Sequence, residues 1–332
     1  MSANRNNPFY QWVRLEQPRL GTRVVWANDE FFGAKERLIE PTEPVFIPDK
    51  YDEHGKWMDG WETRRRREPG HDSSVVRLGV PGVIRGLEID TRHFTGNYPP
   101  QALVEACQDD SDVPAESAWR PLTPMIDLAG NSQRFVNVDS GHVFTHVRLN
   151  IFPDGGVARL RIYGEVRPDW SRIDPRERID LFALENGGRA LLCNDEHFGS
   201  MHNLNLPGRG VNMGDGWETA RRRRPGNDWV IVALGHAGTI EEVEIDTAHF
   251  KGNYPDRAKL QAGRPGDLAP ATLAAESEHW PVLLPETRLG PDARQLCRDL
   301  APLGAVTHVR LSIFPDGGVS RLRLFGYLER KS

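Results

Sequence analysis

The chain has 332 residues, a formal net charge of −5 and 27% charged residues. A chain of this length is expected to form about two domains, and its slightly acidic balance gives no basic field for nucleic acid or a membrane surface. Its three cysteines, Cys107, Cys193 and Cys297, are widely spaced, which argues against a disulfide framework or thiolate zinc site and favours a reducing, cytoplasmic location. Neither a signal-peptide pattern nor a run of about 18 apolar residues occurs, so no secretion and no transmembrane helix are expected.

The first predicted elements follow a lead-in segment, residues 1–20. Residues 22–27 (TRVVWA) predict a short strand that leads into NDEFFG, residues 28–33. The next segment, residues 40–56, contains three prolines, which disfavour helix and central strand. We therefore expect a surface loop there, followed by the distinctive stretch DGWETRRRREPGHD, residues 59–72.

Two β-type runs come next, at residues 74–80 and 83–91, and a Pro-Gly pair separates them. The segment HFTGNYPP, residues 93–100, is expected to be a loop. Residues 101–135 are weakly periodic, and a short helix is predicted around residues 102–107.

A β-hairpin is predicted from residues 145–166. Residues 145–152 alternate between apolar and polar side chains, and residues 157–166 return as a second strand. The PDGG sequence between them is typical of a tight turn, because proline presets φ and glycine allows positive φ. The polar segment that follows, residues 167–178, is interpreted as a linker between domains.

The same blocks recur in the second half of the chain in the same order. Between residues 59–100 and 215–256, 26 of 42 pairs are identical, and between residues 145–164 and 307–326, 16 of 20 are identical. A period near 160 is far longer than the ~20–50 residues of a solenoid repeat, so the chain is a duplicated domain. Many short strands with Gly/Pro turns predict an all-β fold of two tandem β-sandwiches or jelly rolls. The predicted repeats are residues 1–168 and 169–332.

A run of four arginines after Glu62 is the first candidate for chemistry. The second repeat has Ala220 in place of Arg64 but keeps the counterparts of Glu62 and of Arg65–Arg67. A planar guanidinium group matches a carboxylate, so these arginines suit capture of a small carboxylate. A surface network of salt bridges with neighbouring acids explains the pattern equally well.

Glu88, Asp90 and His93 form the second candidate, and the same acid–acid–imidazole set recurs in the second repeat, where it ends at His249. These groups suit general acid–base catalysis, a divalent metal site, or simply the polar face of a strand. No compact histidine spacing occurs, so no tightly bound metal is expected, while a loosely bound divalent ion stays open. Asn97, in GNYP, is a candidate hydrogen-bonding partner for an amide substrate, and a turn held by asparagine and glycine explains the same motif.

The repeated motifs DGWETRRRR, GLEIDTRHFTGNYPP and THVRLNIFPDGG resemble the allantoicase (allantoate amidinohydrolase) family. The resemblance runs from about Leu20 to Glu329 and implies two jelly rolls of the galactose-binding-like kind. It further implies hydrolysis of allantoate to ureidoglycolate and urea in purine degradation for nitrogen use, and a homo-oligomer. Such a reaction needs a cation for the substrate carboxylate, an acid for the departing nitrogen, and a base or metal for water.

The first repeat is predicted to hold the principal site. It has a histidine, His71, beside the shared aspartate where the second repeat has Asn227, and it has ten extra residues in the loop before DGWET. The predicted catalytic residues are Glu62, His71, Asp72, Asp90 and His93. The predicted substrate-binding residues are Arg65, Arg66, Asn97, Glu218, Arg222 and His249.

Two other functions remain open from the sequence. One is a non-catalytic pair of jelly rolls that binds glycans or small carboxylates, since such folds often only bind. The other is a different ureido-hydrolase of the same pathway. Measurement of urea release from allantoate and, separately, from ureidoglycolate distinguishes these hypotheses.

Overall fold

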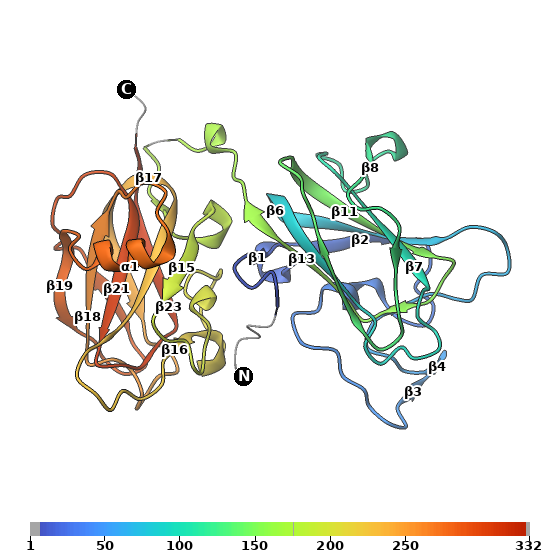
Figure 1. Ribbon diagram of the computed structural model, residues 1–332, viewed down its shortest axis with the longest axis horizontal. Helices are drawn as coiled ribbons and strands as arrows, with labels where there is room; N and C mark the ends of the chain where they lie inside the picture. Colours follow the sequence, from blue (N-terminus) through green and yellow to red (C-terminus); the bar gives the residue numbers. More distant parts are fainter. Residues whose placement is uncertain (1–6, 175, 330–332) are drawn as a thin grey trace. The chain divides into compact units, whose positions relative to one another are not determined.

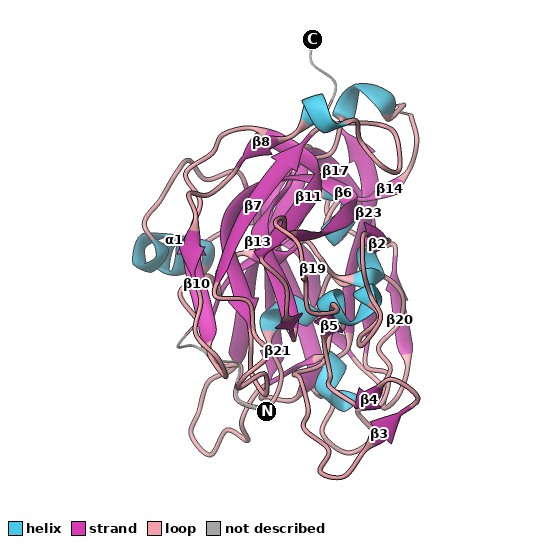
Figure 2. Cartoon of the chain, turned by 90° about the vertical axis from the view of Figure 1, so that its right-hand side faces the viewer, coloured by secondary structure: helices cyan, strands magenta, loops and turns pink. Residues whose placement is uncertain are grey.

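The computed structural model describes residues 7–174 and 176–329. The chain divides into two compact units, and the boundary falls between Arg167 and Pro168 (Figure 1). Strands dominate both units (Figure 2), and each unit has its own buried hydrophobic core. Within the described residues there is one α-helix, α1 (Pro270–Ser277), so the all-β prediction is confirmed. No helix in that part of the chain is both long and apolar enough to cross a membrane.

The first unit contains thirteen strands and three short 3-10 helices before Arg167. The strands are β1 (Val13–Arg14), β2 (Arg23–Ala27), β3 (Tyr51–Asp52), β4 (Gly55–Lys56), β5 (Trp61–Glu62), β6 (Asp72–Asp90), β7 (Gln101–Cys107), β8 (Arg120–Pro121), β9 (Ile126–Asp127), β10 (Gln133–Asn137), β11 (Val143–Phe152), β12 (Gly156–Val157) and β13 (Arg159–Val166). The 3-10 helices are η1 (Pro18–Leu20), η2 (Lys35–Ile39) and η3 (Glu116–Ala118).

Strand β6 is the centre of this unit, and it must bend sharply. Its first part pairs with β2 and β11, while its last part pairs with β10 and β13. The connection from β11 to β13, residues 153–158, can span at most about 25 Å, whereas a straight strand of 19 residues would span about 60 Å. β6 therefore doubles back near Pro81 and Gly82, where proline has no N–H for the ladder.

The bend in β6 creates a two-layer β-sandwich. One layer contains β2, the first part of β6, β11 and β7, and the other contains β10, the last part of β6, β13 and β1. Side chains such as Leu87, Ile89, Leu149 and Ile162 are fully buried between the layers. Each such side chain contributes about 1.5–3 kcal/mol by leaving water.

The predicted hairpin of residues 145–166 is wrong. Strands β11 and β13 both pair with β6 and not with each other, so the PDGG segment arches from one layer to the other. Within the arch, β12 pairs with β5. The PDGG segment does reverse the chain, because a Pro-Gly turn suits an arch between layers as well as a hairpin within one.

The predicted helix around residues 102–107 is also wrong, because these residues belong to β7. Ala102, Val104 and Ala106 are fully buried, and the residues between them are partly exposed. Burial at every second residue is the period of a strand, and it prevails over the helix propensity of alanine.

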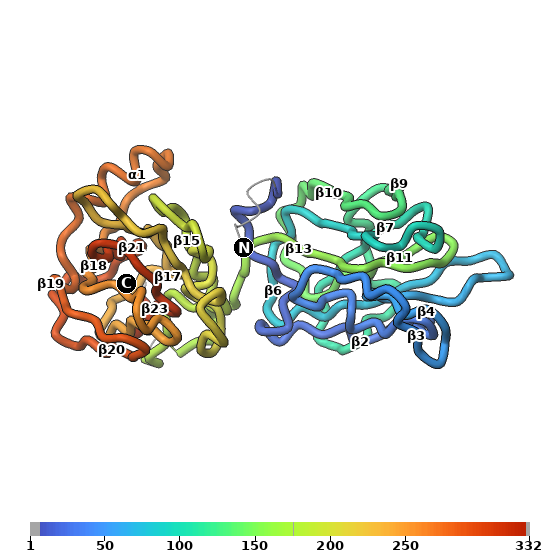
Figure 3. The backbone as a smooth tube through the Cα atoms, turned by 90° about the horizontal axis from the view of Figure 1, so that it is seen from below, coloured from blue at the N-terminus to red at the C-terminus, as the bar shows by residue number. Residues whose placement is uncertain are grey.

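The second unit repeats this arrangement (Figure 3). Its long central strand pairs with β15 and β21 through its first part and with β20 and β23 through its last part. The prediction of a tandem β-sandwich duplication is thus confirmed. The strands are β14 (Ile179–Asp180), β15 (Arg189–Cys193), β16 (Trp217–Glu218), β17 (Asp228–Asp246), β18 (Arg257–Gly263), β19 (Val282–Arg288), β20 (Arg294–Cys297), β21 (Val306–Phe314), β22 (Gly318–Val319) and β23 (Arg321–Leu328).

Candidate active site

The DGWET motif is mostly used to hold the sandwich together. Asp59 accepts a hydrogen bond at Oδ2 from Nη2 of Arg159, 2.8 Å away, and that arginine is 1% exposed. Trp61 is fully buried, and its ring N–H donates to the backbone oxygen of Asp29 at 2.8 Å. A buried charge and a buried indole N–H each need such a partner, so both side chains have structural roles.

Gly60 and Thr63 are explained by the neighbouring arch. A Cβ on Gly60 would lie 2.5 Å from the backbone oxygen of Val157, which leaves no room for any other residue. The backbone N–H of Thr63 donates to the backbone oxygen of Gly155 at 3.1 Å, and the N–H of Gly155 donates back to Oγ1 of Thr63 at 3.2 Å. Glu62 joins the fold through its backbone, which pairs with Gly156 and Gly33, while its carboxyl group is bound by neither the core nor the arch.

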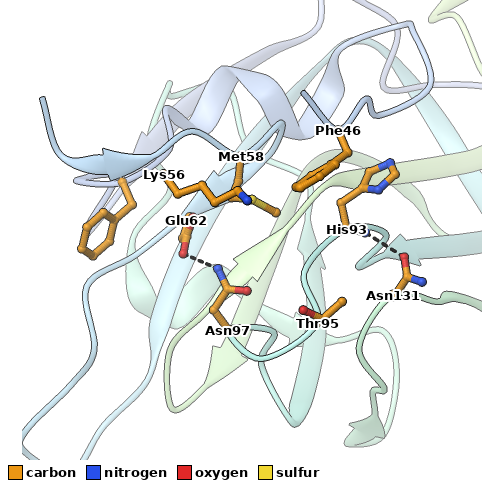
Figure 4. A pocket seen from close by; sticks show the side chains of 9 residues that line it. Phe46, Lys56, Met58, Glu62, His93, Thr95, Asn97 and Asn131 are labelled. Carbon is orange, nitrogen blue, oxygen red and sulfur yellow. Dashed lines mark hydrogen bonds between the residues drawn. The ribbon is translucent and has the colours of Figure 1, made fainter. Parts of the chain in front are cut away.

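Glu62 instead faces a cavity of about 480 Å³ (Figure 4). That volume lies in the ~300–1,000 Å³ range of small-molecule pockets. Three of its walls, Phe46, Lys56 and Met58, come from the loop that is longer in the first repeat. The residues that line the cavity are Phe32, Phe46, Lys56, Met58, Glu62, His93, Thr95, Asn97 and Asn131.

The carboxyl group of Glu62 is held by Asn97. Nδ2 of Asn97 donates to Oε1 of Glu62 at 2.5 Å, and the backbone oxygen of Asn97 accepts from the N–H of Gly156 at 2.7 Å. Burial raises the pKa of Glu62 above its ordinary value, against the lowering effects of the Asn97 hydrogen bond and the positive charge of Arg37. Glu62 therefore keeps its proton to higher pH than an exposed glutamate.

His93 forms another wall of the cavity in an unusual conformation. Its φ is +72°, and its backbone N–H donates to Oδ1 of Asn131 at 2.9 Å. Nε2 lies 3.2 Å from the backbone oxygen of Pro44, which can only accept, so Nε2 is the ring nitrogen that donates and Nδ1 is left for another partner. The ring lies against that of Phe46, with 5.9 Å between ring centres. A non-glycine residue held at positive φ is typical of functional sites.

The second repeat preserves this arrangement of glutamate, asparagine and histidine. Asn253 donates to Glu218, and His249 also has a φ of +72°. Nε2 of His249 lies 2.9 Å from the backbone oxygen of Gly210, and its backbone N–H donates to Oδ1 of Asp292 at 2.7 Å. The structure thus places Glu218 and His249 at positions equivalent to Glu62 and His93.

Three predicted catalytic residues, His71, Asp72 and Asp90, lie outside the cavity lining. Asp90 is fully buried, and its carboxylate accepts from the side chain of Arg92 at 2.5 and 2.9 Å. His71 is exposed, and its ring packs against Phe152 with 4.7 Å between ring centres. The geometry favours a structural role for Asp90 and does not bring His71 or Asp90 together with Glu62.

The ion pair of Arg66 with Asp72, which occurs in both repeats, is also separate from the cavity. Nη1 of Arg66 lies 2.6 Å from Oδ1 of Asp72, a carboxylate that is 1% exposed, and Nδ2 of Asn28 donates to the same oxygen at 2.8 Å. Arg222 and Asp228 form the matching ion pair in the second repeat. This pairing explains why NDEFFG and the arginine run recur together.

Sequence reasoning missed several side chains that line the cavity, among them Phe46, Lys56 and Asn131. The extra length of the first-repeat loop was the available signal, because insertions often border a site. Arg65, predicted to bind substrate, is exposed and is not part of the lining.

Residues 7–174 and 176–329 contain no group of three His, Cys, Asp or Glu side chains arranged to hold a metal ion. Asp90 and His93, the pair considered for a loosely bound ion, are engaged by Arg92 and by the backbone of Pro44. These residues therefore do not form a ready set of metal ligands.

Comparison with known proteins gives a consistent result. Residues 13–167 and 179–329 both match the family model for the allantoicase repeat. The chain is 55% identical over 320 residues to a probable allantoicase 2 of Burkholderia pseudomallei, covering 96% of this chain and 95% of that protein. It is 52% identical over 321 residues to a probable allantoicase of Ralstonia nicotianae, covering 96% of each. The crystal structure of allantoicase from Saccharomyces cerevisiae superposes with a TM-score of 0.78 at 37% identity, over 95% of this chain and 93% of that one.

Proposed function

The chain belongs to the allantoicase family and hydrolyses allantoate to ureidoglycolate and urea in purine degradation, and we propose that this reaction takes place in the first-repeat cavity. One observation carries the proposal. Glu62 is the side chain of DGWET that the sandwich does not need for packing, and it faces this cavity with a raised pKa. Perturbed titratable groups in cavities are characteristic of active sites.

Glu62 is assigned the role of general acid. Allantoate carries a carboxylate and two ureido groups on one carbon, and hydrolysis breaks the bond from this carbon to one ureido nitrogen. Because Asn97 donates to Oε1 of Glu62, the proton of the acid form is on Oε2. That proton passes to the departing nitrogen, urea leaves as a neutral molecule, and the oxygen of water bonds to the carbon.

Asn97 and His93 complete the proposed machinery. The amide oxygen of Asn97 is left to accept an N–H of a ureido group, since its Nδ2 is used on Glu62. His93 is the one histidine among the described residues that line the cavity, and we assign to its Nδ1 the proton lost by water, because its Nε2 faces Pro44. The proton bound there returns to Glu62 through solvent before the next turnover.

We also propose a reducing, cytoplasmic location, supported by the small number and wide spacing of the three cysteines. A homo-oligomer is proposed from the family resemblance, with allantoate as the small-molecule partner. The mechanism requires no tightly bound metal, and a loosely bound divalent ion stays a prediction.

Replacement of Glu62 by glutamine tests the proposal. Urea release from allantoate should fall by roughly 10²- to 10⁴-fold in kcat because the acid is lost, while Tm stays unchanged because the carboxyl group of Glu62 is bound by neither the core nor the arch. In the unaltered enzyme, kcat should decline as pH rises through the raised pKa of Glu62, since the acid form is then lost. Glu62→Gln should abolish this alkaline decline. Retention of full kcat and of the same pH profile by Glu62→Gln would falsify the assignment.

A further inference from the structure

The substrate carboxylate needs a positive partner, and the arginines predicted for this purpose are placed elsewhere. Arg66 is paired with the buried carboxylate of Asp72, and neither Arg65 nor Arg66 lines the cavity. Arg37 lies close enough to lower the pKa of Glu62, but its Nη1 donates to the backbone oxygen of Met58 at 2.8 Å. Like Arg65 and Arg66, Arg37 is absent from the cavity lining, so the cation that meets the substrate is sought among the lining residues.

Among the described residues that line the cavity, Lys56 is the only lysine or arginine. It ends β4 in the longer loop of the first repeat, and its ammonium group points toward the space between Glu62 and Phe46 (Figure 4). Nζ lies 4.6 Å from the centre of the Phe46 ring. Such a cation–π contact positions an ammonium group without neutralising its charge.

The charge of Lys56 is not balanced within the described part of the chain. No carboxylate oxygen there lies within 4 Å of its Nζ, in contrast to Lys35, whose Nζ lies 2.9 Å from Glu36 and 3.2 Å from Glu30. Glu62, the acid in the same cavity, has a raised pKa and is neutral in its proton-donating form. Asp52 lies close enough to raise the pKa of Glu62, but it is not part of the cavity lining, so the ammonium group of Lys56 stays available to a substrate carboxylate.

We propose that Lys56 binds the carboxylate of the substrate and so determines specificity for a ureido acid over an uncharged ureide. The inference rests on the proposed function, because it takes the cavity of Glu62 as the active site. Lys56 holds the carboxylate on the loop side, while Glu62 and Asn97 hold the ureido group on the sandwich side. A lysine supplies a point charge on a flexible stem, so orientation comes from the ureido contacts.

The second repeat lacks this feature at the matching position. Counting back from DGWET, Asn212 stands where the first repeat has Lys56, and Lys251 stands where the first repeat has Thr95. Lys56 is therefore a difference between two repeats that share the Glu–Asn pair, and it assigns carboxylate binding to the first.

The test compares four variants by steady-state urea release from allantoate. Lys56→Met removes the charge, and Lys56→Arg restores it. Lys50→Met is the matched control, because Lys50 belongs to the same loop but its Nζ lies 3.5 Å from the Trp57 ring centre, outside the cavity lining. Lys251→Met examines the corresponding side of the second repeat.

Lys56→Met should raise KM roughly 10- to 100-fold, because it removes a charge-assisted hydrogen bond, with kcat changed less than about threefold. Lys56→Arg should recover most of the loss, and Lys50→Met and Lys251→Met should match the unaltered enzyme. Rising ionic strength should increase KM for the unaltered enzyme through screening of this exposed charge, and Lys56→Met should lose that dependence.

Two results separate the inference from the proposed function. If Glu62→Gln is inactive but Lys56→Met has the KM of Lys50→Met, the cavity is the active site and the role of Lys56 is wrong. If Glu62→Gln keeps full activity, the cavity is not the active site, and the proposed function is wrong whatever the result for Lys56. An equal rise in KM for Lys251→Met would show that the lysine of the second repeat also binds substrate, and would overturn the assignment to Lys56 alone.

Discussion

At the scale of single residues, a side chain that recurs in both repeats more often has a structural role than a catalytic one. Asp59, Trp61 and Arg66 all recur in the second repeat, yet each makes a hydrogen bond or ion pair that joins separate segments of the first unit. A recurring side chain that instead faces a cavity is the better functional candidate, and Glu62 fits this description. Its hydrogen bond to Asn97 serves the cavity and not the core.

Arg66→Ala is expected to affect stability and not substrate binding. It leaves the buried carboxylate of Asp72 without its cation, at a cost of about 1–3 kcal/mol, since Arg66 itself is 29% exposed. Thermal unfolding should show a Tm lower by about 2–4 °C for each kcal/mol, and Arg222→Ala should behave alike. Arg65→Ala, at an exposed position, is the control and should leave Tm unchanged. A raised KM for Arg66→Ala at unchanged Tm would instead restore the sequence-based role.

At the scale of elements, the arch between β11 and β13 connects the core to the site. It provides the partners of Thr63 through Gly155 and the partner of the Asn97 backbone through Gly156. The two layers of the sandwich therefore determine where Asn97, and with it the carboxyl of Glu62, is held. The longer loop before DGWET adds Phe46 and other walls from outside the sandwich.

Gly155→Ala tests the arch. Gly155 has a φ of +141°, and an added Cβ would lie 2.8 Å from the backbone oxygen of Asn97, so both strain and a shift of Asn97 are expected. Stability should fall by about 1–3 kcal/mol, and displacement of Asn97 should lower kcat by ~10-fold or more. Gly317→Ala, at φ +135° and 2.7 Å from the backbone oxygen of Asn253, should lose similar stability by denaturant titration while retaining kcat. Equal losses of kcat would mean that both repeats catalyse.

At the scale of the whole molecule, the duplication provides two copies of the same β-sandwich, and the loops around the two copies differ. Both repeats keep the Glu–Asn pair and a histidine at positive φ. The first repeat adds Phe46 and Lys56 from its longer loop. His71, which suggested the first repeat from the sequence, is exposed and packs on Phe152, so the loop is the better reason for the same choice.

Comparison of Glu218→Gln with Glu62→Gln measures how much of the catalytic activity each repeat contributes. We expect Glu218→Gln to keep kcat within about threefold of the unaltered enzyme, because the longer loop is absent from its repeat. Urea release per mole of chain, with circular dichroism as a check on folding, is the measurement. If each variant instead loses about half of the activity, the repeats contain two equivalent sites, and a larger loss at Glu218 would reverse the assignment.

The sequence by itself determined the β-class, the duplication and the family, because alternation, turn residues and repetition are local properties, and it named Glu62 and Asn97 as candidate site residues. Tertiary structure alone decided that residues 145–166 form an arch, that Asp90 turns to Arg92, and that Lys56 reaches the cavity. These outcomes depend on which strands pair across the two layers. Pairing follows from burial between distant segments, and a local pattern such as Pro-Gly or Glu-x-Asp is compatible with either layer.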